Sequence, residues 1–152
     1  MVYISHPVIV PFEYSRIDRF IFLGSNKCCE LHFKKELLKK GILADISVDD
    51  EAVDRPFGVK YFFWMPVVDK KAPELDELLV GAKMLKMLVE SKIKVYVHCK
   101  RGHGRSPTLV AAYYILLGDK YLNAIKRIGD KRKIHMSREQ IGVLKKFEKF
   151  VR

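Results

Sequence analysis

The chain has 152 residues, of which 49% are hydrophobic and 31% charged, and its formal net charge is +11 at pH 7. This length and composition predict one compact domain over residues 1–152 with a substantial core. No stretch approaches the roughly 20 apolar residues of a membrane span, and the first residues lack the basic start of a signal peptide. The excess of lysine and arginine favours acidic partners: phosphorylated proteins, nucleic acid or anionic lipid. The alternative is a lysine-rich surface that is merely solvated.

The cysteine content indicates a reducing environment. Three cysteines, two of them adjacent, do not make a disulfide framework, so we expect a cytoplasmic protein. Cys28, Cys29 and His32 suggest one half of a metal site, but the other half is missing from the sequence. We therefore expect core or partly exposed thiols and no bound metal. One glutamine and two asparagines against many charged residues are typical of proteins from thermophiles.

The first half of the chain alternates between strand-like and helix-like patterns. The patterns predict a strand over 16–25, an amphipathic helix over 31–41, a strand over 41–51 that runs into an acidic loop, and a strand over 59–68. The last of these is too apolar for a surface strand, so we expect it to be buried, with Trp64 and Met65 in the core.

The second half continues the alternation. It predicts a helix over 73–91, a buried strand over 93–98, a helix over 106–118 that is hydrophobic nearly all round, and closing helices over 121–128 and 137–151. Strands that alternate with helices predict an α/β fold with a central, mostly parallel sheet flanked by helices. Ligands bind such sheets where strands end and helices begin. The segment HCKRGHGRS (98–106) lies at such a junction, which predicts an active site there.

This loop places Cys99 among basic residues and glycines. The thiolate is the nucleophilic form of cysteine, and cations or a helix N-terminus favour it. Gly102 and Gly104 let backbone N–H groups turn inward to bind a dianion, and the helix that starts near Ser106 directs its positive end to the same place. Arg105 can hold two phosphoryl oxygens at once with its planar guanidinium. The loop therefore predicts a nucleophilic cysteine that acts on a phosphoryl group.

Cysteine, five residues, arginine and a hydroxyl residue resembles the signature of the cysteine-dependent protein tyrosine phosphatase superfamily. The segments RIDRFIFLGS, LLKKGILADISV and SREQIGVLKKFEKF resemble the opening strand, the helix-to-strand step and the closing helix of small dual-specificity phosphatases of the archaeal and atypical type. The resemblance implies a metal-independent phosphatase without a cofactor that forms a phosphocysteine. It implies action on phosphotyrosine in proteins, and the short chain implies a shallow pocket that also admits phosphoserine and phosphothreonine.

The resemblance also implies a role for each catalytic residue. Cys99 attacks phosphorus, Arg105 holds the phosphoryl group, and Ser106 hydrogen-bonds the thiolate as it departs. Asp69, thirty residues before Cys99, protonates the leaving oxygen from a mobile loop and then activates water. Asp76 is the alternative acid, although it falls inside a predicted helix, where it complements the helix dipole.

The remaining candidates support the site. The phosphate-binding loop consists of Lys100, Arg101, Gly102, His103 and Gly104, whose basic side chains surround the pocket mouth. His98 orients the loop. Gln140 aligns with a glutamine that positions the attacking water in some relatives, the alternative being an exposed helix residue. Arg132 is expected to be solvated, with a phosphate contact as the alternative.

Other functions share the same loop chemistry. The basic loop also resembles phosphoinositide phosphatases of the superfamily, and RNA 5′-triphosphatases are relatives with basic surfaces. A non-catalytic phosphate-binding module should lack Cys99 or Arg105, and both are present. A rhodanese-like sulfur transferase would not need Asp69.

Overall fold

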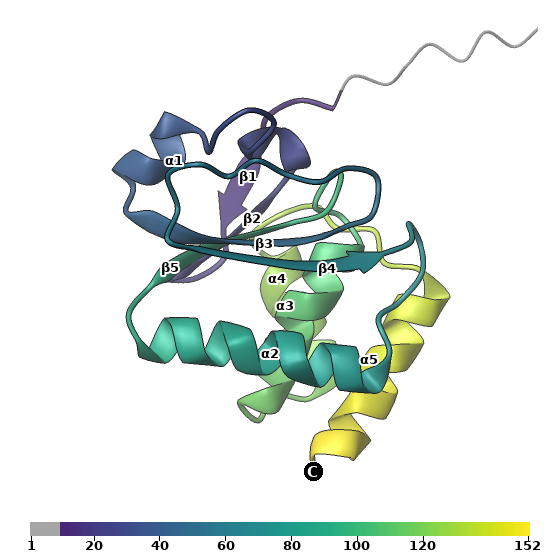
Figure 1. Cartoon of the computed structure of the whole chain (residues 1–152). Helices are drawn as coiled ribbons and strands as arrows, with labels where there is room; N and C mark the ends of the chain where they lie inside the picture. Colours follow the sequence, from purple (N-terminus) through teal and green to yellow (C-terminus); the bar gives the residue numbers. More distant parts are fainter. Residues whose placement is uncertain (1–9) are drawn as a thin grey trace, which may run out of the picture.

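The computed structural model describes residues 10–152, which form a five-stranded sheet between two layers of helices (Figure 1). In chain order the elements are β1 (Tyr14–Arg16), β2 (Ile21–Gly24), the 3-10 helix η1 (Asn26–Cys28), α1 (Lys35–Lys39), β3 (Ile42–Asp49), β4 (Tyr61–Val67), α2 (Leu75–Glu90), β5 (Lys94–His98), α3 (Arg105–Leu116), α4 (Tyr121–Gly129) and α5 (Arg138–Val151).

The sheet is mostly parallel, which confirms the predicted fold class. Its strand order is β1-β2-β5-β3-β4, and only β1 and β2 pair antiparallel. The central strand β5 therefore lies between β2 and β3, and all three end at the same edge. Its last residue, His98, is opposite Gly24 of β2 and Ser47 of β3. The predicted active-site loop leaves the sheet at this edge and enters α3.

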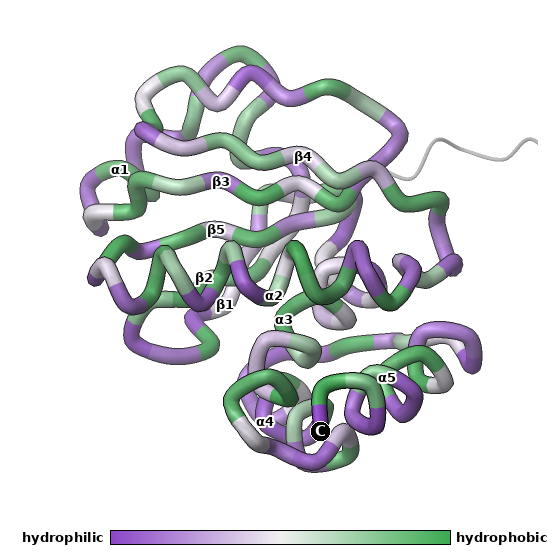
Figure 2. The backbone as a smooth tube through the Cα atoms, turned by 60° about the horizontal axis from the view of Figure 1, so that its bottom comes forward, coloured by the Kyte–Doolittle hydropathy of each residue, from purple (hydrophilic) through white to green (hydrophobic). Residues whose placement is uncertain are grey.

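Two layers of helices cover the sheet. η1 and α1 pack on one face around Phe33, Leu37 and Tyr96, whereas α2, α3, α4 and α5 pack on the other. Every residue of α3 from Arg105 to Ile115 is buried, as expected of a helix that is hydrophobic nearly all round. Figure 2 shows hydrophobic residues along the strands of the sheet, and hydrophobic and hydrophilic residues in alternation along α2, α4 and α5. Within residues 10–152, none of the helices is both long and apolar enough to cross a membrane.

Two elements in the first half of the chain depart clearly from the predicted ones. The predicted strand 16–25 is the turn and second strand of a hairpin, because Asp18 accepts hydrogen bonds from the N–H groups of Phe20 and Ile21 at 2.8 and 2.9 Å and turns the chain there. The predicted helix 31–41 is shortened to α1, since the chain before it folds as η1 and an irregular segment in which Leu31 is exposed.

The expectation that 59–68 is buried is wrong for most of its residues. β4 is the last strand of the sheet, and only Met65 and Val67 within it are buried. Trp64 is 40% exposed and donates its indole N–H to the carbonyl of Asp49 at 2.8 Å. A strand at the sheet edge has only one neighbour, so its apolar side chains remain partly in solvent.

Candidate active site

Cys99 lies directly after β5, at the floor of the loop, and is only 3% exposed. Gly102 donates its backbone N–H to the Cys99 sulfur at 3.2 Å, and the Ser106 hydroxyl lies 3.2 Å from the same atom. A negatively charged sulfur is stabilised by donors of this kind. The structure thus brings Cys99 and Ser106 together as predicted.

The carbonyl groups of the loop are bound outside it. Lys100 accepts from the N–H of Asn26 at 3.0 Å, Arg101 from the guanidinium of Arg132 at 3.2 Å, and His103 from the N–H of His135 at 2.7 Å. In a planar trans peptide the carbonyl and the next N–H point in opposite directions. The N–H groups that follow these carbonyls are therefore directed toward the interior of the loop, where an anion can accept them.

Gly102 is required by the shape of this loop. Its φ is +76°, and an added Cβ would lie 2.5 Å from the carbonyl oxygen of Gly24. We expect Gly102→Ala to destabilise the protein by roughly 1–3 kcal/mol and to abolish vanadate binding, measured by calorimetry. The control is Gly118→Ala, whose φ is +120° with no atom within 4 Å of the added carbon. If Gly102→Ala bound vanadate as well as Gly118→Ala, the loop geometry described here would be wrong.

Arg105 lies in the first turn of α3 and is 2% exposed. Its Nη1 donates to the carbonyl of Val67 at 2.7 Å and to Asp50 at 3.3 Å, and its Nη2 donates to Glu51 at 2.8 Å. A guanidinium has five N–H donors. Nη2 also donates to the second oxygen of Glu51 at 3.1 Å. Among the described residues Nε has no hydrogen-bond partner, so its N–H is available to an oxygen of a bound anion.

The partners of Arg105 keep it charged. Burial would lower the pKa of Arg105, but the hydrogen bond with Glu51 and nearby negative charge raise it above its usual value. Burial and a hydrogen bond with Asp49 raise the pKa of Glu51, against the lowering effect of Arg105. The acidic loop after β3 therefore holds the guanidinium in place, a contact that the sequence reasoning did not anticipate.

Asp69 lies shortly after the end of β4 and also approaches Arg105. Its carboxylate lies 3.8 Å from Nε of Arg105, and its side chain is 65% exposed. The alternative residue, Asp76, lies in the first turn of α2, as predicted, and is exposed. Asp69 lines the cavity above Cys99 and Asp76 does not. Of the two carboxylates, the structure brings only Asp69 to the cavity above Cys99.

The cavity above Cys99 has a volume of about 160 Å³ and a basic rim. Its lining residues are Asp69, Lys70, Cys99, Lys100, Arg101, His103, Gly104, Arg105, His135, Ser137 and Gln140. Burial and the nearby Arg132 lower the pKa of His103, which disfavours the charged form of this side chain. Lysine and arginine side chains supply positive charge at the rim.

Gln140 lines this cavity from the first turn of α5 and is buried, so the alternative of an exposed helix residue is wrong. Its carboxamide oxygen accepts from the N–H of Ser137 at 2.9 Å, and its NH₂ group donates to the carbonyl of Lys71 at 3.0 Å. An added Cβ on Gly104 would lie 3.0 Å from the carboxamide oxygen. Gln140 thus joins α5 to both the catalytic loop and the Asp69 loop.

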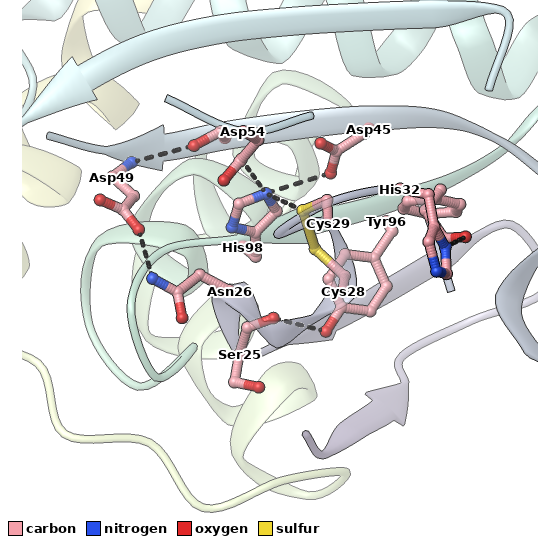
Figure 3. The surroundings of a disulfide bond; sticks show 12 residues. Ser25, Asn26, Cys28, Cys29, His32, Asp45, Asp49, Asp54, Tyr96 and His98 are labelled. Atoms are coloured by element: carbon pink, nitrogen blue, oxygen red, sulfur yellow. Dashed lines mark hydrogen bonds and ion pairs between the residues drawn. A yellow bond between two sulfur atoms is a disulfide. The ribbon is translucent and has the colours of Figure 1, made fainter. Parts of the chain in front are cut away.

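His98 supports the loop from below, where it is fully buried (Figure 3). Its Nε2 lies 3.1 Å from Asp45 and 2.8 Å from Asp54. Burial would lower the pKa of His98, but these two carboxylates raise it well above its usual value. Burial raises the pKa of Asp45 despite the opposing effect of His98. The acidic partners of His98 were not foreseen from the sequence.

Two further expectations are corrected near the loop. Cys28 and Cys29, expected as thiols, are joined by a disulfide beside His98. Arg132, expected to be solvated, is buried, and it donates to the carbonyl of Leu23 at 2.8 Å besides that of Arg101. The basic run 131–133 suggests solvated side chains, but Arg132 is buried because backbone carbonyls accept its N–H groups.

Comparison with known proteins identifies the class to which this fold and site belong. The sequence profile of the dual specificity phosphatase catalytic domain matches residues 21–150. The chain is 28% identical to protein tyrosine phosphatase type IVA 2 of Mus musculus in an alignment of length 150 that covers 94% of this chain and 89% of that protein. It is 38% identical to phosphatidylglycerophosphatase and protein-tyrosine phosphatase 1 of Homo sapiens in an alignment of length 151 that covers 90% of this chain and 73% of that protein.

Solved structures agree with the sequence comparisons. The crystal structure of PTPMT1 superposes with a TM-score of 0.76 at 28% identity, covering 91% of this chain and 96% of that chain. Human DUSP28, at 20% identity, has the same fold with a TM-score of 0.82, covering 93% and 96% of the two chains. The protein is an enzyme of the protein tyrosine phosphatase superfamily. Within it, the chain belongs to the dual-specificity phosphatase family, which confirms the resemblance found in the sequence.

Proposed function

We propose that this protein hydrolyses phosphotyrosine, and also phosphoserine and phosphothreonine, in proteins without a metal ion. The observation that carries the proposal is the environment of Cys99, whose sulfur lies beneath a basic cavity with a backbone N–H and a hydroxyl each at 3.2 Å. We also propose that residues 1–152 act as one catalytic domain in the cytoplasm of a thermophile.

The reaction proceeds in two steps on these residues. The Cys99 thiolate attacks phosphorus, and the bond from phosphorus to the leaving oxygen breaks while Asp69 donates a proton to that oxygen. The second step reverses the roles: Asp69 takes a proton from water, which attacks the phosphocysteine and releases phosphate and the thiolate. Arg105 and the backbone N–H groups of the loop hold the phosphoryl oxygens throughout. Ser106 stabilises the departing thiolate, and His98 and Gln140 hold the loop in position.

A substrate panel tests this function. Peptides with phosphotyrosine or phosphoserine, phosphoinositides and triphosphorylated RNA are each assayed for phosphate release after brief incubation with excess EDTA. We expect phosphotyrosine hydrolysis to be unchanged by EDTA and to be inhibited by vanadate, an oxyanion that mimics the transferring phosphoryl group. Loss of hydrolysis in EDTA that added Mg²⁺ restores would rule out the metal-independent route.

A second candidate is the headgroup of a phosphorylated lipid. Two observations favour it: a relative at 38% identity is named a phosphatidylglycerophosphatase, and PTPMT1 has been crystallised in complex with PI(5)P, with a TM-score of 0.77 to this chain. The rim lysines and arginine provide the positive charge that attracts an anionic lipid surface. The same chemistry at Cys99 would then act on a lipid phosphate.

Lys100 and Arg101 lie at the cavity rim. Replacing them tests whether their charge attracts an anionic lipid surface, as distinct from taking part in the reaction. We expect Lys100→Ala with Arg101→Ala to lower kcat/KM at least about 10-fold for phosphoinositide in anionic vesicles, because steering by local charge is lost, and to change hydrolysis of a small aryl phosphate by less than about twofold. The matched control is Lys145→Ala with Lys146→Ala on α5, which removes the same charge from outside the cavity. Equal losses on both substrates would show that the loop cations do not select the surface.

A further inference from the structure

Behind the catalytic loop, four buried side chains with metal-binding atoms come together, and the phosphatase chemistry uses none of them as a reacting group. Cys28 and Cys29 come from the end of η1, Asp45 from β3 and His98 from β5 (Figure 3). Their donor atoms all lie within 4.8 Å of one another. The sequence shows the two cysteines but places the other two residues far along the chain. The fold supplies the half of the site that the sequence lacks.

The buried carboxylates near His98 face too few hydrogen-bond donors. Asp45 and Asp54 both face one nitrogen, Nε2 of His98, at 3.1 and 2.8 Å. Neither oxygen of Asp45 makes a well-directed hydrogen bond within residues 10–152, although the side chain is fully buried. Buried carboxylates are normally paired, because an unpaired buried charge costs several kcal/mol. A bound cation would give the Asp45 carboxylate the direct partner that it lacks.

One donor distance matches a tetrahedral cation and a second is close to it. Zinc binds sulfur at about 2.3 Å and nitrogen or oxygen at about 2.0–2.2 Å, so tetrahedral donors lie roughly 3.3–3.8 Å apart. The Cys29 sulfur is 3.5 Å from Nε2 of His98, within this range, and the Asp45 carboxylate is 3.1 Å from the same nitrogen, slightly below it. The two cysteine sulfurs are bonded to each other in this structure and separate only on reduction. The other ring nitrogen, Nδ1, lies 3.4 Å from the carbonyl of Cys99. A metal-bound histidine typically donates its second N–H to such a carbonyl.

We propose that Cys28, Cys29, Asp45 and His98 form a structural site for a zinc-class divalent cation when the two cysteines are reduced. A dithiol or phosphine reductant supplies two electrons to the Cys28–Cys29 bond and is itself oxidised, and the two sulfurs take up two protons. The cation then displaces both thiol protons and the Nε2 proton of His98 into solvent, and Nδ1 keeps its proton. Asp54 gives up its contact with Nε2. Thiolate and imidazole ligands together favour zinc over magnesium or calcium.

This site would connect three segments of the chain directly below the nucleophile. His98 is the residue before Cys99, and none of the four ligands lines the catalytic cavity. The cation would therefore fix the position of the loop without touching substrate. The inference does not rest on the proposed function, because metal binding can be measured in a chain that lacks the nucleophile.

Cobalt titration of the reduced Cys99→Ser chain tests the proposal, since this variant removes the third thiol from the spectrum. We expect one Co²⁺ per chain, with a thiolate-to-cobalt band in the near ultraviolet and the strong visible bands of tetrahedral Co²⁺. Zn²⁺ should displace the cobalt. Zn²⁺ should also raise the Tm of the reduced chain by roughly 5 °C or more, because it binds only the folded state.

Three comparisons assign the ligands. The same chain with the Cys28–Cys29 disulfide, verified by mass, should give no band. Cys29→Ser and Asp45→Asn should each weaken Co²⁺ binding at least about 10-fold. His32→Ala should bind as the parent chain does, since His32 contacts the carbonyl of Phe33 at 2.9 Å. The proposal is wrong if the reduced chain gives no band, or if the disulfide form gives the same band. The comparison of the reduced form with the disulfide form uses one sequence, so it decides the matter even if a substituted chain fails to fold.

Discussion

Cys99→Ser should lose essentially all turnover, at least about 10⁴-fold in kcat, while it still binds phosphate and vanadate. A serine hydroxyl is a far weaker nucleophile than a thiolate at neutral pH. The anion is held by backbone N–H groups and Arg105, which the substitution leaves in place. Turnover of an aryl phosphate measures the first effect, and vanadate affinity by calorimetry measures the second.

Arg105→Lys is the matched comparison for this result. A lysine carries the same charge but cannot supply two parallel N–H donors, and it would leave Glu51 and Asp50 without their present partner. We expect this variant to lose both turnover and vanadate binding. If Cys99→Ser kept substantial activity, or if both variants bound vanadate equally, the division of roles between the two residues would be incorrect.

Asp69→Asn should slow hydrolysis of a phosphotyrosine peptide by roughly 10²–10⁴, the usual contribution of general acid catalysis. Asparagine cannot donate a proton to the leaving oxygen. The loss should be smaller for aryl phosphates whose phenol is already acidic, because such a leaving group needs little protonation. The alkaline limb of the kcat/KM profile should flatten, since activity no longer depends on a protonated acid. Steady-state kinetics on a series of aryl phosphates measures all three effects.

Asp76→Asn is the control for Asp69. It removes the same charge in the first turn of α2, outside the cavity, so only a small loss of helix stability is expected. If Asp76→Asn lost the rate and the alkaline limb while Asp69→Asn kept both, the general acid would be Asp76.

The catalytic loop could be predicted from the sequence because its parts are contiguous. Cys99, Arg105 and Ser106 lie within one strand–loop–helix step, so local spacing alone sets their relation. Asp69 could be proposed because its loop also follows directly from a strand. The parallel sheet and its helices followed from the alternation of patterns, which depends on local periodicity.

Contacts between distant segments could not be predicted in this way. Asp50 and Glu51 look like an ordinary acidic loop, and nothing local shows that they hold Arg105. Asp45 sits in an apolar strand, and its relation to His98 depends on β3 and β5 being neighbours. The exposure of Trp64 likewise depends on β4 lying at the sheet edge. The sequence cannot show this position, because an apolar run is compatible with a central strand and with an edge strand.

The most direct test of the mechanism is detection of the covalent intermediate. An aryl phosphate is mixed with the protein and quenched in acid within the first turnovers, and the digested peptides are analysed by mass spectrometry. We predict that the peptide containing Cys99 gains the mass of one phosphoryl group, and that this gain increases in Asp69→Asn with a substrate of acidic phenol, because water is then activated slowly. A quenched, actively turning-over protein whose Cys99 peptide carries no phosphoryl group, or whose phosphoryl group lies on another residue, would contradict the account.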